Sequence, residues 1–197
     1  MSPVIEERLA KLATLSLKSG AHSPDSTFCV MEAVAFVAGE PWSDHPECAC
    51  PVISAFLRAW NDGLPSDADR DRLLKSLIPR MVGTRNKDLE KKRSLMAADW
   101  LIRVHTPAWL RLAGLTEQAD RIANLPEITD MAQYPSLRGP LEAVRDDAYA
   151  AWDASRAAAR DAAGAAAWDA AKTKLTPTVL ELQNSALKLV ERMIETE

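Results

Sequence analysis

The chain has 197 residues, of which 24 are Lys or Arg and 28 are Asp or Glu, so its formal net charge at pH 7 is −4. This length predicts one globular domain, with or without an appendage. The balance of 47% hydrophobic and 26% charged residues excludes global disorder, and the small negative charge excludes a protein that coats polyanions with its whole surface.

Three further features concern the location of the protein. The N-terminal residues lack the basic segment and apolar run that are typical of a signal peptide. The longest apolar run, 29–39, is interrupted by Glu32 and is far shorter than the roughly 20 residues that a membrane span needs. Three cysteines are too few for a disulfide framework. We therefore expect a cytoplasmic protein that does not bind membranes.

The first half of the chain shows apolar residues at helical spacing, separated by Gly, Pro and Ser-Asp segments that favour loops. The predicted elements are a helix over 3–18, a helix capped by Ser26 or Thr27 that ends at Gly39, an irregular segment over 40–50, a helix that begins at Pro51 and ends at Gly63, and a helix from Ser66 that ends or kinks at Pro79.

The second half continues in the same way, and no segment shows the alternation expected of a β-strand. The predicted elements are a helix capped by Asn86 that reaches His105, a restart at Thr106–Pro107 that ends at Gly114, a short helix over 116–122, a turn near Tyr134, one long helix over 136–174, and a last helix that restarts at Thr176–Pro177. The fold class predicted is all-α, with about eight to ten helices.

The most unusual segment is rich in alanine, which accounts for 14 of the 24 residues over 148–171. Alanine is the best helix former, so this segment predicts a long helix. Sixteen residues separate Trp152 from Trp168, which places them about 160° apart around a helix axis. With Tyr149, they are candidate interaction residues. The helix either packs against the rest of the chain or projects and pairs with a partner, for which a second copy is one candidate.

These patterns predict a compact helical domain over 1–135, followed by the alanine-rich helix and a closing helix over 136–197. Trp60, Trp100 and Trp109 lie at helical spacing among aliphatic residues, which predicts that all three belong to the core. Trp42 lies in the irregular segment, where it either pins the loop or lines a pocket, and we favour the pin.

The run from Phe28 to Pro46, the segments Cys50–Ile53 and Val82–Arg85, and the tail of Ala, Trp and Asp carry a resemblance. Over most of 28–175 the chain resembles a group of bacterial and phage proteins that often end in alanine-rich helices and have no assigned activity. The resemblance implies a bacterial or mobile-element setting, in which inhibitors and accessory proteins are common. It supplies no catalytic residues.

Cysteine and histidine gather in one part of the sequence and suggest metal binding. Zinc takes four nitrogen or sulfur ligands, and Cys29, His45, Cys48 and Cys50 could supply them. Alternatively, Cys29 is a nucleophile that uses His45 or His105 as its base. The remaining interpretation is that the cysteines are small buried apolar residues.

A basic stretch over 80–111 contains eight basic and only three acidic residues. Such a concentration is compatible with a surface that contacts phosphate groups of nucleic acid, but a solvated helix face is the simpler interpretation. The candidate phosphate-binding residues are Arg80, Arg85, Lys87, Lys91, Lys92 and Arg93.

No nucleophile elbow, nucleotide-binding loop or metalloprotease motif occurs in the sequence. We therefore expect a non-enzymatic helical protein that needs no cofactor and binds a protein partner or a second copy of itself, as an accessory or inhibitor protein. The alternatives are a nucleic-acid-binding or phosphate-binding accessory protein and a small Cys/His metal protein or hydrolase.

Overall fold

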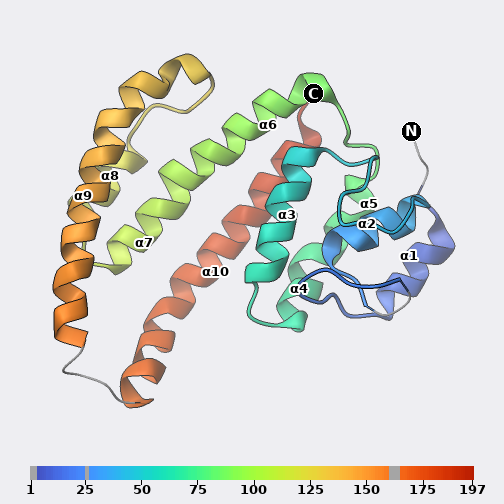
Figure 1. Cartoon of the computed structure of the whole chain (residues 1–197), viewed down its shortest axis with the longest axis horizontal. Helices are drawn as coiled ribbons and strands as arrows, with labels where there is room; N and C mark the ends of the chain where they lie inside the picture. Colours follow the sequence, from blue (N-terminus) through green and yellow to red (C-terminus); the bar gives the residue numbers. More distant parts are fainter. Residues whose placement is uncertain (1–3, 25–26, 160–164) are drawn as a thin grey trace. The chain divides into compact units, whose positions relative to one another are not determined.

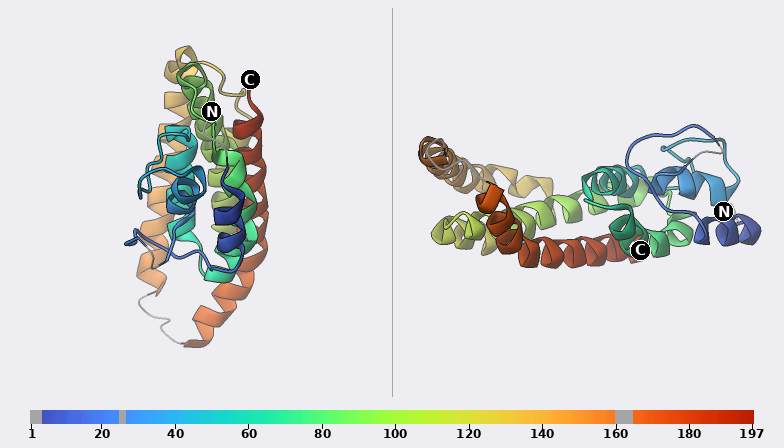
Figure 2. Two further views of the ribbon diagram at one scale, coloured as in Figure 1. Left: turned by 90° about the vertical axis from the view of Figure 1, so that its right-hand side faces the viewer. Right: turned by 90° about the horizontal axis from the view of Figure 1, so that it is seen from below.

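The computed structural model describes residues 4–24, 27–159 and 165–197, with side chains outside 151–172 (Figure 1). Helices dominate these residues, as Figure 2 shows from two other sides, and the described part of the chain contains no β-strand beyond an isolated bridge between Leu17 and Phe28. The all-α prediction is confirmed. No described helix is long and apolar enough to cross a membrane.

The contacts divide the chain into two compact units. Unit 1 comprises Met1–Ser94 together with Leu187–Glu197, and unit 2 comprises Leu95–Ala186. The predicted division at residue 135, into a helical core over 1–135 and a pair of helices over 136–197, falls within unit 2 and stays a prediction. Two helices, α6 (Lys87–Trp100) and α10 (Ala165–Glu195), run from one unit into the other.

Unit 1 is built around one helix whose apolar residues point in every direction, which is typical of a fully buried helix. In this helix, α2 (Val30–Ala38), the side chains of Val30, Met31 and Val34 are completely buried. Gly39 ends it with a φ of 74°, as the sequence predicts. The other helices of unit 1 are α1 (Glu6–Ala13), α3 (Pro51–Gly63), α4 (Asp67–Leu74) and α5 (Ile78–Met81), with a 3-10 turn over Lys75–Leu77.

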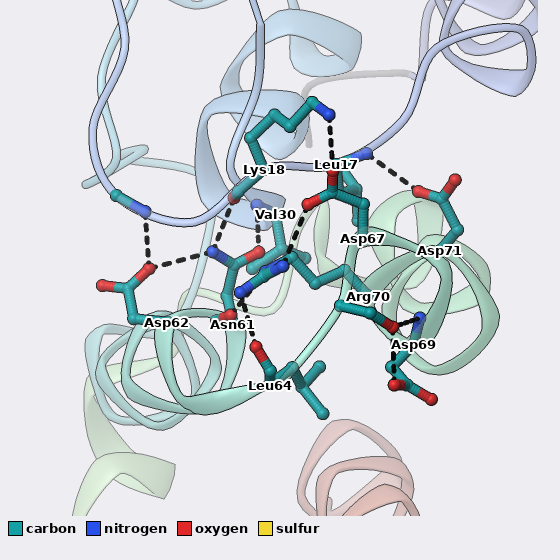
Figure 3. Close-up of polar contacts among 12 residues, drawn as sticks. Leu17, Lys18, Val30, Asn61, Asp62, Leu64, Asp67, Asp69, Arg70 and Asp71 are labelled. Carbon is teal, nitrogen blue, oxygen red and sulfur yellow. Dashed lines mark hydrogen bonds and ion pairs between the residues drawn. The ribbon is translucent and has the colours of Figure 1, made fainter.

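The first helix is shorter than the sequence predicts, because α1 ends at Ala13 and not near residue 18. Leu17 is instead extended, and its backbone N–H donates to the carboxylate of Asp71 at 2.8 Å. Side chains hold the rest of this segment in the same way (Figure 3): Asp62 accepts from Gly20 N, and Asn61 donates to Lys18 O. Tertiary hydrogen bonds therefore replace the last turn of the predicted helix.

Arg70 and Asn61 are the buried centre of this polar network. The Arg70 guanidinium donates to the carbonyl of Asn61 at 2.8 Å and to the carbonyl of Leu64 at 2.6 Å. Asn61 also accepts from Val30 N at 3.3 Å. The network thus ties the end of α3 to the first residue of α2.

Unit 2 contains the end of α6, a π-helical segment over Leu101–His105, α7 (Thr106–Leu112), α8 (Thr116–Ala123), a 3-10 turn over Met131–Gln133, α9 (Tyr134–Ala159) and the first part of α10. Its core forms where α7, α8 and α9 meet. The buried residues at this junction are Leu110, Ala119, Ile122 and Val144.

The predicted restart at Thr106–Pro107 is wrong, because the chain stays helical from Lys87 to Leu112. Pro107 has no N–H and cannot continue the regular hydrogen-bond ladder. The π segment absorbs this defect: both the backbone N–H and the hydroxyl of Thr106 donate to the carbonyl of Leu101. One wider turn therefore takes the place of a break.

The predicted restart at Thr176–Pro177 is also wrong, because α10 continues through Pro177. Both residues are exposed. The single helix predicted over 136–174 is described as the end of α9 at Ala159 and the start of α10 at Ala165, and residues 160–164 lie outside the described part.

Candidate interaction surface

Cys29 is a capping residue of α2. Its sulfur accepts a hydrogen bond from Glu32 N at 3.4 Å, and the Glu32 carboxylate accepts one from Cys29 N at 2.7 Å. Burial raises the pKa of the Cys29 thiol to about 12, so the thiolate needed for nucleophilic attack is not formed near neutral pH. The nucleophile prediction therefore finds no support in this geometry.

Glu32 and His22 are polar partners that the sequence did not reveal. The Glu32 side chain is buried, and its carboxylate contacts both the backbone N–H and Nδ1 of His22, at 2.7 and 2.9 Å. Trp42 donates from Nε1 to the carbonyl of His22 and stacks near Phe28, at 4.9 Å between ring centroids. The indole thus pins the segment before α2, as the pin interpretation predicts.

The remaining candidate metal ligands have other contacts. Nδ1 of His45 lies 2.5 Å from the carboxylate of its neighbour Asp44. Burial, followed by a hydrogen bond to Glu40, raises the pKa of the Cys48 thiol to about 11. Cys50 is buried, and its N–H donates to Thr84 Oγ1 at 2.9 Å. Within the described residues, no three His, Cys, Asp or Glu side chains form a group that could hold a metal ion.

The basic stretch has largely structural roles in unit 1. Arg93 is 2% exposed, and its guanidinium donates to the carbonyls of Thr84 and Met193 at 2.7 and 2.8 Å. Arg80 pairs with Glu191 and Glu195 of α10, at 3.1 and 2.8 Å.

The four other basic candidates are exposed: Arg85 lies in the loop before α6, and Lys87, Lys91 and Lys92 lie in its first turns. Lys92 donates to the carbonyl of Glu197 at 3.2 Å, and Arg85 lies 3.9 Å from Glu90. The side chains of Lys87 and Lys91 are exposed to solvent. Fewer basic side chains of this stretch are therefore available to bind phosphate than the sequence indicates.

Exposed apolar side chains follow a different distribution. Among the residues whose side chains the structure describes, every exposed large hydrophobic residue lies in unit 2. We call this set the apolar surface, and it consists of Leu101, Val104, Trp109, Met131, Tyr134, Tyr149, Leu175 and Leu180. Only Tyr149 was a candidate from the sequence. Trp152 and Trp168 lie outside the described side chains.

The π segment and α7 bring a histidine and two tryptophans together at the apolar surface. His105 lies between Trp100 and Trp109, with centroid distances of 5.2 and 6.2 Å. Trp109 is 38% exposed, so the prediction that it belongs to the core is wrong. It donates from Nε1 to His105 Nε2 at 3.1 Å, while Trp100 donates to Ser185 Oγ of α10 at 2.7 Å.

A shallow pocket of about 280 Å³ opens beside this aromatic group, within unit 2. Its apolar lining comes from Val104, Ala108 and Leu182, and its charged rim from Arg103, Arg111 and Glu181. Arg103 pairs with Asp99 at 2.9 Å, and Arg111 pairs with Asp120 at 2.7 Å. The arginines are thus neutralised within unit 2, and the apolar floor remains open.

Comparison with protein-family models, curated proteins and solved structures finds no match to this chain. The resemblance to bacterial and phage proteins stays a prediction.

Proposed function

We propose that this chain is a helical protein-interaction module that associates with a second copy of itself through the apolar surface of unit 2. The observation that supports this proposal is the unequal distribution of exposed apolar side chains, all of which belong to unit 2 among the described residues. Exposed apolar side chains that gather in one part of a protein favour an interaction site there. In the described part of unit 1, the large apolar side chains are buried or half-buried.

The charge of unit 2 favours a second copy as the occupant. Its residues, 95–186, include nine basic and twelve acidic side chains, which is close to neutral for a segment of this length. In a twofold dimer the same surface meets itself, so a strongly charged surface would repel its copy. Ion pairs within the unit, such as Arg138–Glu142 at 2.9 Å, further reduce the field that a second copy meets.

The test compares two lysine substitutions in the full chain. Leu180→Lys places a charge at a position of the apolar surface that is 47% exposed, so the monomer keeps its core. Ala59→Lys is the matched control, because it adds the same charge to an exposed position of α3 in unit 1. We expect the wild-type chain and Ala59→Lys to form dimers of twice the 21.6 kDa chain mass.

For Leu180→Lys we expect an association constant that is at least about tenfold lower, since a twofold dimer contains the substitution twice. Sedimentation equilibrium over a range of concentrations measures the association constant. A wild-type chain that stays monomeric at its highest soluble concentration would overturn the proposal. Equal association constants for Leu180→Lys and Ala59→Lys would show that the interface does not include Leu180 of α10, and would also contradict the proposal.

A further inference from the structure

The contact between Trp109 and His105 fixes the protonation state of the histidine. An indole N–H can only donate, so His105 Nε2, 3.1 Å away, must accept and therefore carries no proton. The imidazole is then neutral, with its hydrogen on Nδ1. Burial, the one cause of its shift, lowers the pKa of His105 below the ordinary value of 6.5 and favours the same state.

His105 occupies the centre of an apolar stripe. Leu101 precedes it by four residues and Trp109 follows it by four, a spacing that places all three on one side of the helix. Leu101 is 51% exposed and Trp109 is 38% exposed. A charge on His105 would therefore appear among the side chains that a second copy must cover.

Two aspartates around this stripe are paired with arginines. Asp99 and Arg103 flank it on its own helix and pair with each other at 2.9 Å. Arg111 of α7 pairs with Asp120 of α8 at 2.7 Å. Glu181 of α10 lines the pocket next to both arginines. The two aspartates that could stabilise a protonated His105 are thus engaged with arginines.

We propose that His105 is a pH-sensitive latch of the apolar surface, which holds Trp109 in its associating position when neutral and releases it when protonated. A proton on Nε2 replaces the acceptor with a second donor that faces the indole N–H, so the hydrogen bond is lost. The proposal rests on the proposed self-association and adds its regulation.

The direction of the pH effect follows from linkage. Association buries His105 further and so favours its neutral form, which makes the pKa lower in the dimer than in the monomer. The dimer is therefore fully stable above the monomer pKa and weakens as the pH falls below it. One proton released per subunit is two per dimer, so the association constant changes by at most about a hundredfold per pH unit.

The first experiment uses tryptophan fluorescence at a concentration where the chain is monomeric. Imidazolium quenches indole fluorescence more strongly than neutral imidazole does, so the wild-type chain is expected to lose emission with a midpoint below pH 6.5. His105→Gln removes the titrating group but keeps an acceptor for Trp109, and it should lose the transition. His45→Gln, at an exposed position of unit 1, is the control and should keep it.

The second experiment measures the association constants of the same variants at pH 7.5 and at about pH 5.0 by sedimentation. We expect at least about tenfold weaker association of the wild-type chain at the lower pH, and much less change in His105→Gln. An identical fluorescence transition in His105→Gln, or equal pH dependence of its association, would overturn the latch. A chain that is monomeric at both pH values would instead overturn the proposed self-association.

Discussion

Removing the guanidinium of Arg93 tests the structural role of this residue most directly. Its two hydrogen bonds join α6 to the carbonyl of Thr84 in the preceding loop and to the carbonyl of Met193 near the end of α10. Hydrogen bonds from a charged donor contribute about 1.5–3 kcal/mol each, and truncation leaves two buried carbonyls without this donor. We therefore expect Arg93→Ala to lower the free energy of unfolding by about 3–5 kcal/mol.

Urea unfolding followed by far-UV circular dichroism measures this change. Arg93→Lys keeps the positive charge near the end of α10 but lacks the planar fork that reaches both carbonyls, so it should recover part of the loss. Lys91→Ala, at an exposed position of the same helix, should change the free energy of unfolding by less than about 0.5 kcal/mol. A cost below about 1 kcal/mol for Arg93→Ala would refute the reasoning, because the two carbonyls would then not depend on the guanidinium.

Three further predictions follow from local geometry. Gly39→Ala should destabilise the chain by at least about 1–2 kcal/mol in the same urea assay, because φ is 74° there and an added Cβ would lie 2.9 Å from Ile5 Cδ1. Cys29, with a pKa of about 12, should react with iodoacetamide at pH 8 far more slowly in the native chain than after unfolding, as mass spectrometry of the labelled peptide would reveal. Pro177→Ala should raise the melting temperature, since proline inside a helix costs about 3 kcal/mol relative to alanine, and a lower melting temperature would contradict its exposed placement.

The sequence predicts those parts of the fold that depend on neighbours along the chain. Pro51 begins a helix and Gly39 ends one, because both effects act within a single turn. Pro107 and Pro177 do not break their helices: a π turn accommodates the first, and α10 continues through the second despite its local cost. Such outcomes depend on the surroundings of the residue, which spacing alone does not contain.

The candidate site shows the same limit. Trp109 lies four residues after His105, so their contact could have been predicted from helical spacing. That Trp109 is exposed depends on which faces of α7 the other helices of unit 2 cover. For Arg93 the sequence is misleading. A basic residue in a charged stretch predicts a solvated or phosphate-binding side chain, but Arg93 is buried and donates to the carbonyl of Met193 on α10, 100 residues later.

The division of unit 1 between two distant segments affects how the chain can fold during synthesis. Leu189, Val190 and Met193 are almost completely buried, yet a ribosome makes them after all of unit 2. The partners of Arg93 and Arg80 on α10 are therefore synthesised about a hundred residues after these two arginines. A nascent chain that stops within unit 2 displays an open core to chaperones and proteases, so this topology couples completion of unit 1 to prior synthesis of the proposed associating surface.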